Sequence, residues 1–357
     1  MARQLNEPLK GRGATGNPDN RFDAHTVEAV DDGWGSLDAP AEPLRTEVQA
    51  DSARSVITSN QSPDVPFDRS INPYRGCEHG CVYCFARPTH AYLGLSPGLD
   101  FESRLFYKRD AAARLREELA RPGYRPAPVA LGINTDAYQP LERRLRVTRD
   151  ILEVLAECGH PLTLVTKSAL IERDLDILAD LAARDLVQVM VSVTTLEREL
   201  ARRMEPRAAA PQRRLQVIER LCAAGVPTGV LVAPLIPVLT DAELETILQA
   251  ARDAGALAAG YVLLRLPHEV HALFEDWLAA HYPLAAAHVM NRLRDCRGGR
   301  AYDARFGTRM RGEGVYADLI AQRFRKACRR LGFGEMPELD CGRFRPPAAH
   351  RDQLPLF

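Results

Sequence analysis

The chain has 357 residues, 46% of them hydrophobic, and its 47 basic and 47 acidic side chains give a formal net charge of zero. This composition supports a sizeable core. There is no run of 18 apolar residues to predict a membrane span, and the polar start MARQLNEPLKGRGATGN lacks the apolar core of a signal peptide. Eight cysteines, three of them clustered, fit a reducing cytoplasm better than a disulfide scaffold, so we predict a cytoplasmic protein.

In chain order, residues 1–60 show no sustained periodicity and predict a largely irregular N-terminal extension. From Ser70 onward, apolar runs rich in Val, Leu and Ile alternate with amphipathic segments. Such runs are typical of parallel strands covered on both faces. Six strands are expected. The first ends near Pro73, and the other five lie at 128–134, 161–166, 187–193, 226–234 and 260–266. The helices between them are expected at 109–120, 141–158, 171–184, 212–224 and 241–254. Six βα units predict an α/β fold, a partial (β/α)6 barrel of the TIM type, over residues 61–270.

The rest of the chain predicts a basic helical region over 271–335, with helices at about 284–296 and 315–331, and a flexible tail over 336–357. The basic excess suits either a nucleic-acid face or an ordinary solvated surface. The connection at 297–319 favours phosphate contact over a plain turn because five arginines stand among glycines. These arginines are Arg297, Arg300, Arg305, Arg309 and Arg311.

Cys77, Cys81 and Cys84 are spaced C-x3-C-x2-C directly after the first strand. Thiolates suit iron–sulfur clusters, zinc or Cu(I). A structural zinc site prefers four ligands in two separated pairs, and no second pair follows here, while His79 is too close in sequence to its neighbours to reach the same ion. A [4Fe–4S] cluster normally takes four cysteines, so three would leave one iron open to a substrate or cofactor. A zinc loop and an incidental trio of thiols are the alternatives.

Polar side chains follow the second, third and fourth strands. In a parallel barrel, chemistry sits at the carboxyl ends of the strands. Thr135 and Asp136 follow the second strand, Lys167 the third, and Ser192 closes the fourth. Thr135 and Asp136 could instead cap the next helix, and Lys167, one of only four lysines, could be an ordinary loop residue.

The pattern C-x3-C-x-aromatic-C, with Tyr83 as the aromatic residue, closely resembles the cluster motif of radical S-adenosylmethionine (SAM) enzymes. Together with TDAYQPLE, VTKS, VSVTT and MEPRAAAPQRRL, it resembles the branch related to spore photoproduct lyase over about residues 66–320. The resemblance implies a [4Fe–4S] cluster on the three cysteines and SAM on its open iron. Reductive cleavage of SAM would give a 5′-deoxyadenosyl radical, with an electron donor such as flavodoxin or ferredoxin.

The resemblance also assigns residues and a substrate. It implies that Tyr83 backs the adenine of SAM, and that polar groups of SAM contact Thr135, Asp136, Lys167 and Ser192. DNA would be the substrate. Two departures set this chain apart: the lyase has a cysteine near the end of the second strand, where this chain reads Gly132-Ile133-Asn134, and a tyrosine where it has Phe85. The lyase's hydrogen-return relay is therefore not expected, and no catalytic acid or base is named; Asp136, Tyr138 and Glu142 are only neighbouring candidates.

The chain ends in a five-residue segment that resembles the pentapeptide by which bacterial polymerases and repair proteins bind the DNA polymerase sliding clamp. Its clamp-contacting residues would be Gln353, Leu354, Leu356 and Phe357, presented by the spacer Pro346-Pro347-Ala348-Ala349. Alternatively, the tail packs on the protein's own surface.

We therefore predict a radical SAM enzyme that repairs or modifies DNA. One alternative is a radical SAM enzyme with a non-nucleic-acid substrate. The other is a clamp-associated DNA-binding protein with a structural or redox-sensing cluster.

Overall fold

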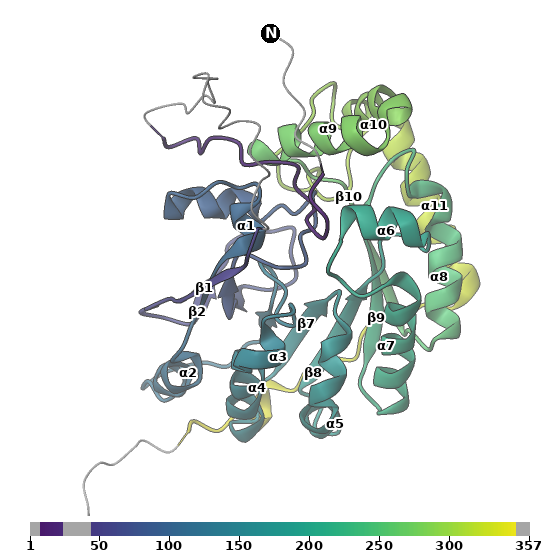
Figure 1. The fold of residues 1–357 in the computed structure, drawn as a ribbon. Coiled ribbons are helices and arrows are strands. Elements are labelled where there is room, and N and C mark those ends of the chain that lie inside the picture. The colour runs from purple at the N-terminus through teal and green to yellow at the C-terminus, as the bar shows by residue number, and fades with distance from the viewer. Residues whose placement is uncertain (1–7, 24–43, 348–357) are drawn as a thin grey trace, which may run out of the picture.

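A seven-stranded sheet forms the body of the protein in the computed structural model, which describes residues 8–23 and 44–347 (Figure 1). Its strand order is β10-β9-β8-β7-β6-β3-β2. Six neighbouring strands are parallel, and β2 pairs antiparallel with β3 at one edge. The strands are β2 (Ile57–Ser59), β3 (Arg69–Ile71), β6 (Val129–Leu131), β7 (Leu162–Thr166), β8 (Val187–Ser192), β9 (Thr228–Leu235) and β10 (Ala258–Leu263). The predicted partial barrel of six parallel strands is confirmed, with β2 added.

Helices cover the outer face of this sheet, as Figure 1 shows for the ring from α2 to α8. They bury their apolar faces against alternating Leu and Val side chains of the strands, which form the main core. The helices are α2 (Ala111–Leu119), α3 (Glu142–Leu145), α4 (Val147–Glu157), α5 (Leu175–Ala182), α7 (Pro211–Ala223) and α8 (Leu244–Asp253). The segment predicted as one helix over 141–158 is broken because Arg146 takes a left-handed conformation, with φ of 57°. The segment 171–184 begins as a 3-10 helix, η2 (Ala169–Asp174), and a short η3 (Asp241–Glu243) precedes α8.

A second, three-stranded sheet with order β1-β5-β4 stands beside the barrel. Its strands are β1 (Glu47–Ala50), β4 (Tyr74–Arg75) and β5 (Arg104–Tyr107), and between β4 and β5 lie η1 (Arg87–Leu93) and α1 (Asp100–Ser103). Strands of two to four residues carry no readable periodicity, so the sequence did not predict this sheet. It frames the segment from Gly76 to Ala86, which holds the three clustered cysteines.

The C-terminal region supplies three further helices, and α6 (Arg198–Met204) follows β8. Helices α9 (Glu269–His281) and α10 (Pro283–Asp295) lie at the upper end of the barrel in Figure 1, and α11 (Val315–Leu331) packs on α8. No helix of the described ranges is long and apolar enough to cross a bilayer.

The connection between α10 and α11 links the two edges of the open sheet. Leu263 of β10 donates its backbone N–H to the carbonyl of Met310 at 2.9 Å. One residue earlier, the guanidinium of Arg309 pairs with Asp64, which lies in the connection from β2 to β3, with Nε to Oδ2 at 2.6 Å. Side chains therefore bridge the gap between β10 and β2.

The segment after α11 runs beneath the strands, where Figure 1 shows it in yellow. The N–H groups of Asp340 and Arg345 donate to the carbonyls of Asp185 and Cys158, each at 2.8 Å, around a short η4 (Cys341–Arg343). The sequence assigns residues 336–347 to a flexible tail, but the structure differs because Phe344 is buried against aromatic rings. The terminal pentapeptide lies outside the described residues.

Phe344 packs against the rings of Tyr124 and His160, with its ring centre 5.4 Å from each. The Tyr124 hydroxyl lies 2.8 Å from Nε2 of His160, and Nδ1 of His160 lies 3.0 Å from the carbonyl of Pro161. Burial lowers the pKa of His160 to about 4, so the ring is neutral in the folded protein at neutral pH.

We expect His160 to make stability depend on pH. Below about pH 6.5 the unfolded chain takes up a proton that the folded chain accepts only near pH 4. The free energy of unfolding should therefore fall by roughly 2 kcal/mol between pH 7 and pH 5 through this group alone. In His160→Gln that drop should be smaller by roughly the same amount, measured by urea unfolding at both pH values.

The control for this measurement is His288→Gln, which replaces an exposed histidine of α10 and leaves the His160 ring in place, so the drop assigned to His160 should remain. An unchanged drop in His160→Gln would contradict the assignment to the buried ring.

Candidate functional site

The cysteine segment begins with a turn that only glycine accommodates. Gly76 and Gly80 have φ of 74° and 67°, which is the left-handed region. A Cβ on Gly76 would lie 2.6 Å from the Leu105 side chain. The backbone is then tied on two sides: the N–H of Cys77 donates to the carbonyl of Phe101 at 2.9 Å, and that of Val82 to Met204 at 3.0 Å.

The three thiols of Cys77, Cys81 and Cys84 share one small region and none forms a disulfide. Burial raises the pKa of all three, and the neighbouring thiols contribute to the rise for Cys77 and Cys81. The positive charge of Lys167 acts in the opposite direction on Cys81 and Cys84, as does that of Arg87 on Cys84. Buried thiolates would thus find cations beside them, which suits a group bound through sulfur.

The arrangement is compatible with an iron–sulfur cluster. The three cysteines carry free thiols, with Cys77 buried and Cys81 and Cys84 partly buried. In such a cluster, thiolates of cysteines hold the iron atoms. Within the described ranges, no three His, Cys, Asp or Glu side chains are placed to hold one metal ion. The trio of unpaired thiols therefore fits a [4Fe–4S] cluster.

A buried ion pair supports the cysteine segment from behind. Arg87 Nη2 lies 2.5 Å from Glu102 Oε1, and both side chains are fully buried. The same guanidinium donates to the carbonyls of Gly80, Cys81, Pro97 and Gly98, at 2.8–3.3 Å. Two backbone carbonyls of the segment are thereby fixed in place.

The N-terminal segment 8–23 closes over this ion pair and crosses the upper end of the barrel, where Figure 1 shows it in purple. The N–H groups of Gly13 and Ala14 donate to the Glu102 carboxylate at 3.0 and 2.9 Å. Arg12 donates to the Glu102 carbonyl at 2.7 Å. A Cβ on Gly13 would lie 1.8 Å from the Gly80 carbonyl oxygen, so the two backbones are in direct contact. Sequence reasoning predicted an irregular extension and missed this role.

Tyr83 and Lys167, two of the residues assigned to SAM, lie together. Lys167 follows the carboxyl end of β7, and we call this end of the barrel its mouth. The Lys167 ammonium is 5.9 Å from the centre of the Tyr83 ring. The Tyr83 hydroxyl donates to the buried carboxylate of Glu205, which also accepts from Thr194 Oγ1 at 2.7 Å and from Arg214. Burial raises the pKa of Glu205. The sequence analysis did not name Glu205 as a site residue. Its place in MEPRAAAPQRRL, one of the stretches that carry the family resemblance, could have indicated it.

Asp136, Thr135 and Ser192 are placed at the strand ends as expected, but the polar groups of the first two are already occupied. The Asp136 carboxylate accepts from Thr166 Oγ1 and from the N–H of Lys167, both at 2.8 Å. Its Oδ2 also lies 3.4 Å from His79 Nδ1. The Thr135 hydroxyl donates to the Tyr74 carbonyl at 2.8 Å. Ser192 is 2% exposed, and its carbonyl accepts from Arg214 at 3.2 Å.

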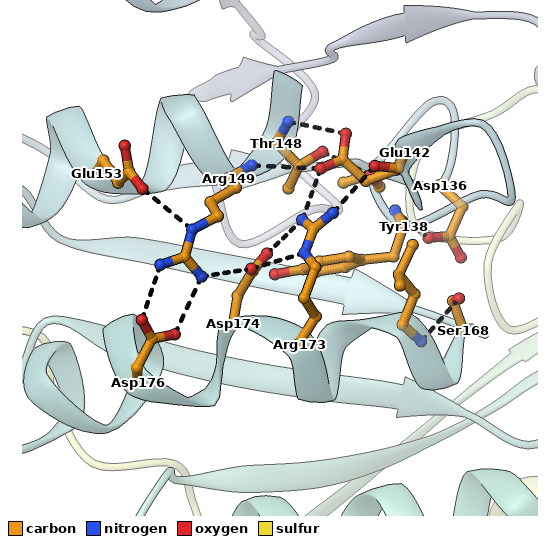
Figure 2. Close-up of polar contacts among 12 residues, drawn as sticks. Asp136, Tyr138, Glu142, Thr148, Arg149, Glu153, Ser168, Arg173, Asp174 and Asp176 are labelled. Carbon is orange, nitrogen blue, oxygen red and sulfur yellow. Dashed lines mark hydrogen bonds and ion pairs between the residues drawn. The ribbon is translucent and has the colours of Figure 1, made fainter. Parts of the chain in front are cut away.

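Glu142 belongs to a buried charge network (Figure 2). It accepts from Tyr74, from the N–H of Thr148 at 3.0 Å and from Arg173 at 2.7 Å. Arg173 and Arg149 in turn hold Asp174. Tyr138 lies beside this network, with its ring centre 6.0 Å from the Arg173 guanidinium, while its buried hydroxyl has no hydrogen-bond partner among the described residues. The network therefore ties Glu142, at the end of the loop from 134 to 142, to η2.

The arginines between α10 and α11 are mostly engaged within the protein. Arg297 is 1% exposed and donates to the carbonyls of residues 263, 264, 308 and 309. Arg305 pairs with Asp303 and Glu313, and Arg309 with Asp64. Arg297 and Arg309 are therefore not free for the expected phosphate contact, because backbone carbonyls and Asp64 already satisfy them. The Arg305 side chain stays 62% exposed beside its two acidic neighbours, so the expectation stays a prediction for that residue.

Comparison with known proteins identifies related chains. Residues 71–251 match the family model of the radical SAM superfamily. An uncharacterized protein of Mycobacterium tuberculosis is 42% identical over 221 residues, which cover 61% of this chain and 65% of the relative, just under two thirds of its length. An uncharacterized protein of Methanocaldococcus jannaschii is 24% identical over 199 residues, covering 56% of this chain and 71% of the relative.

Solved structures share the fold. Spore photoproduct lyase complexed with dinucleoside spore photoproduct superposes with a TM-score of 0.56 at 15% identity, over 80% of this chain and 79% of that chain. A mutant of that lyase with bound AdoMet and dinucleoside spore photoproduct gives 0.53 at 16% identity, over 80% and 78%.

Gly13→Ala should loosen the thiol segment. The added Cβ cannot coexist with the Gly80 carbonyl at 1.8 Å, so the N-terminal segment must move away and release Glu102. We expect iron bound to the reconstituted protein to be lost to a chelator on the order of tenfold faster than from the wild type, the ratio that ~1.4 kcal/mol gives.

The matched control is Gly334→Ala, where a Cβ meets no atom within 4 Å; it should retain iron as the wild type does. Equal iron loss from all three proteins would show that the N-terminal segment does not support the thiols.

Proposed function

Because the chain belongs to the radical SAM superfamily, we propose that it cleaves SAM reductively at a [4Fe–4S] cluster on Cys77, Cys81 and Cys84 and acts on DNA. The observation that carries the proposal is the trio of unpaired thiols, one buried and two partly buried, beside Lys167 and Tyr83. When bound, the cluster and SAM would supply a 5′-deoxyadenosyl radical by one-electron cleavage of a C–S bond. An electron donor such as flavodoxin or ferredoxin would serve the reaction.

The residues around the thiols would bind and orient SAM. The ring of Tyr83, held through its hydroxyl by Glu205, offers a flat face to the adenine. Lys167 offers a cation to the carboxylate or ribose of SAM. Asp136 spends its carboxylate on Thr166 and on the backbone N–H of Lys167, so it would act by positioning Lys167.

Thr135 and Ser192 would complete the SAM site from the ends of neighbouring strands. Both are 2% exposed. The Thr135 hydroxyl donates its one hydrogen to the Tyr74 carbonyl, and its oxygen lone pairs remain able to accept a hydrogen bond from the amino group or ribose of SAM.

The proposal of a DNA substrate draws on the lyase fold. The solved lyase structures contain dinucleoside spore photoproduct, and a likeness of fold supports a nucleic-acid substrate here. The departures at Gly132-Ile133-Asn134 and Phe85 point to a different way of ending the reaction. Gly132 has φ of 75° and a Cβ there would lie 2.8 Å from the Ala137 side chain, so this turn has no room for a thiol-bearing side chain at that position.

Cys81→Ala should abolish 5′-deoxyadenosine formation and leave the protein folded. The assay uses anaerobically reconstituted protein with dithionite and SAM, with and without UV-irradiated DNA, and measures 5′-deoxyadenosine by chromatography. Cys222→Ala is the control, because that thiol on α7 donates to the Gly255 carbonyl; it should react as the wild type does.

The outcomes separate the three functions. A yield that changes with DNA supports the proposal, and a yield independent of DNA favours another substrate. If the wild type binds four irons but forms no 5′-deoxyadenosine, the cluster is structural or redox-sensing and the proposed chemistry is wrong.

We also propose that the terminal Gln353-Leu354-Pro355-Leu356-Phe357 binds the DNA polymerase sliding clamp, on the strength of its sequence. Deleting residues 353–357 should abolish clamp binding in a pull-down or by surface plasmon resonance. Formation of 5′-deoxyadenosine should be unaffected. The contacts that hold the segment after α11 on the barrel extend to Arg345, so the deletion removes none of them. Clamp binding that survives the deletion would refute this docking.

A further inference from the structure

Three exposed aromatic rings stand beside the cysteine segment. Phe22, Phe85 and Tyr92 leave 57%, 43% and 72% of their surface exposed. Phe85 follows Cys84 directly, and Tyr92 lies in η1, which continues the same segment. Exposed apolar rings that lie together mark a surface that another molecule covers; Phe22 and Tyr92 are such a pair, and Phe85 lies seven residues before Tyr92 in the same stretch of chain. We call Phe22, Phe85, Tyr92 and Arg265 the rim surface.

Phe22 and Tyr92 form one platform although 70 residues separate them. Their ring centres are 5.3 Å apart, and the Arg21 guanidinium lies over both, at 4.8 and 5.4 Å. Arg21 is itself held by Glu269 at 2.9 Å. Asn20 next to it donates to the Ala91 carbonyl at 2.9 Å. The platform is therefore fixed on both sides, yet the rings remain open to solvent.

The Arg265 guanidinium is poorly hydrogen-bonded, and Arg265 lies four residues before α9, which packs on η1 with its Tyr92. It follows the carboxyl end of β10, and its guanidinium lies 5.3 Å from the centre of the Phe85 ring. Its buried Nε has no hydrogen-bond acceptor. Its other nitrogens reach only Met310 Sδ at 3.6 Å and the Tyr302 hydroxyl at 3.5 Å, and no carboxylate of the described residues pairs with it. A guanidinium left this poorly satisfied suits an incoming anion.

We propose that the rim surface binds single-stranded nucleic acid, with unpaired bases stacked on Phe85 and on the Phe22–Tyr92 platform and a phosphate at Arg265. The inference rests on the proposed function and states the form in which its substrate is bound. Aromatic rings next to an arginine are the combination that holds unpaired strands. Paired bases cover one another's faces inside a duplex, so a duplex would gain little from these rings.

The test measures binding of a fluorescent single-stranded oligonucleotide by anisotropy, without SAM or reductant and at fixed salt. Tyr92→Ser should weaken binding by about tenfold, within the range that stacking on one aromatic residue contributes. Arg265→Gln should weaken binding and lower the salt slope by about one phosphate contact. A duplex of the same sequence should compete poorly.

The control is Leu284→Ser on α10, because Leu284 is fully exposed (101%) and lies outside the rim surface; it should bind as the wild type does. Wild-type affinity in both Tyr92→Ser and Arg265→Gln would overturn the inference, as would equal competition by the duplex. So would a wild type that binds no oligonucleotide.

The two proposals fail separately. Formation of 5′-deoxyadenosine that depends on Cys81 tests the radical chemistry, and it needs no strand binding. If the rim variants bind normally while that chemistry persists, only the rim surface is refuted.

Discussion

The ion pair between Arg87 and Glu102 is the interaction on which the rest of the site depends. Both side chains are fully buried, so removing either would leave an uncompensated charge in the interior, typically at a cost of about 3–5 kcal/mol. The pair is also a junction: Arg87 holds carbonyls of Gly80 and Cys81, and Glu102 holds the N–H groups of Gly13 and Ala14. The N-terminal segment, the cysteine segment and Glu102 of α1 therefore meet at this pair, and the position of the cysteine segment depends on all three.

The buried carboxylates of the mouth all serve the protein itself. Asp136 orients Lys167, Glu205 holds Tyr83, and Glu142 locks the loop before α4. The thiols, the Lys167 ammonium and the Tyr83 ring remain for a bound cofactor. This division agrees with chemistry in which the cofactors supply the reactivity and the chain supplies binding and orientation.

The features that could be predicted from the sequence are those that leave a local pattern in it, namely the parallel strands and the cysteine group. Six apolar runs at regular spacing are enough for the parallel strands, and the C-x3-C-x2-C spacing is enough for the thiol group. The sequence could not predict the contact between Gly13 and Gly80, because nothing near either glycine records a partner 67 residues away. The phosphate contacts predicted for Arg297 and Arg309 failed for the same reason: their acceptors include the carbonyls of Leu263 and Leu264 and the carboxylate of Asp64, which the fold brings from far along the chain. Asp136 lies at the strand end as predicted, but its carboxylate accepts from Thr166 Oγ1 and from the backbone N–H of Lys167, contacts that no local pattern records.

The Arg309–Asp64 bridge closes the open side of the barrel without strand pairing. A closed barrel joins its first and last strands by a row of backbone hydrogen bonds. Here the connection from β2 to β3 meets the connection from α10 to α11 through the Arg309–Asp64 ion pair, whose side chains are 15% and 10% exposed, and the Gly307 backbone adds a hydrogen bond to Asp64. The spacing between the two sheet edges therefore depends on side-chain and loop contacts, and a substitution at Asp64 would act on that spacing without touching any strand pairing.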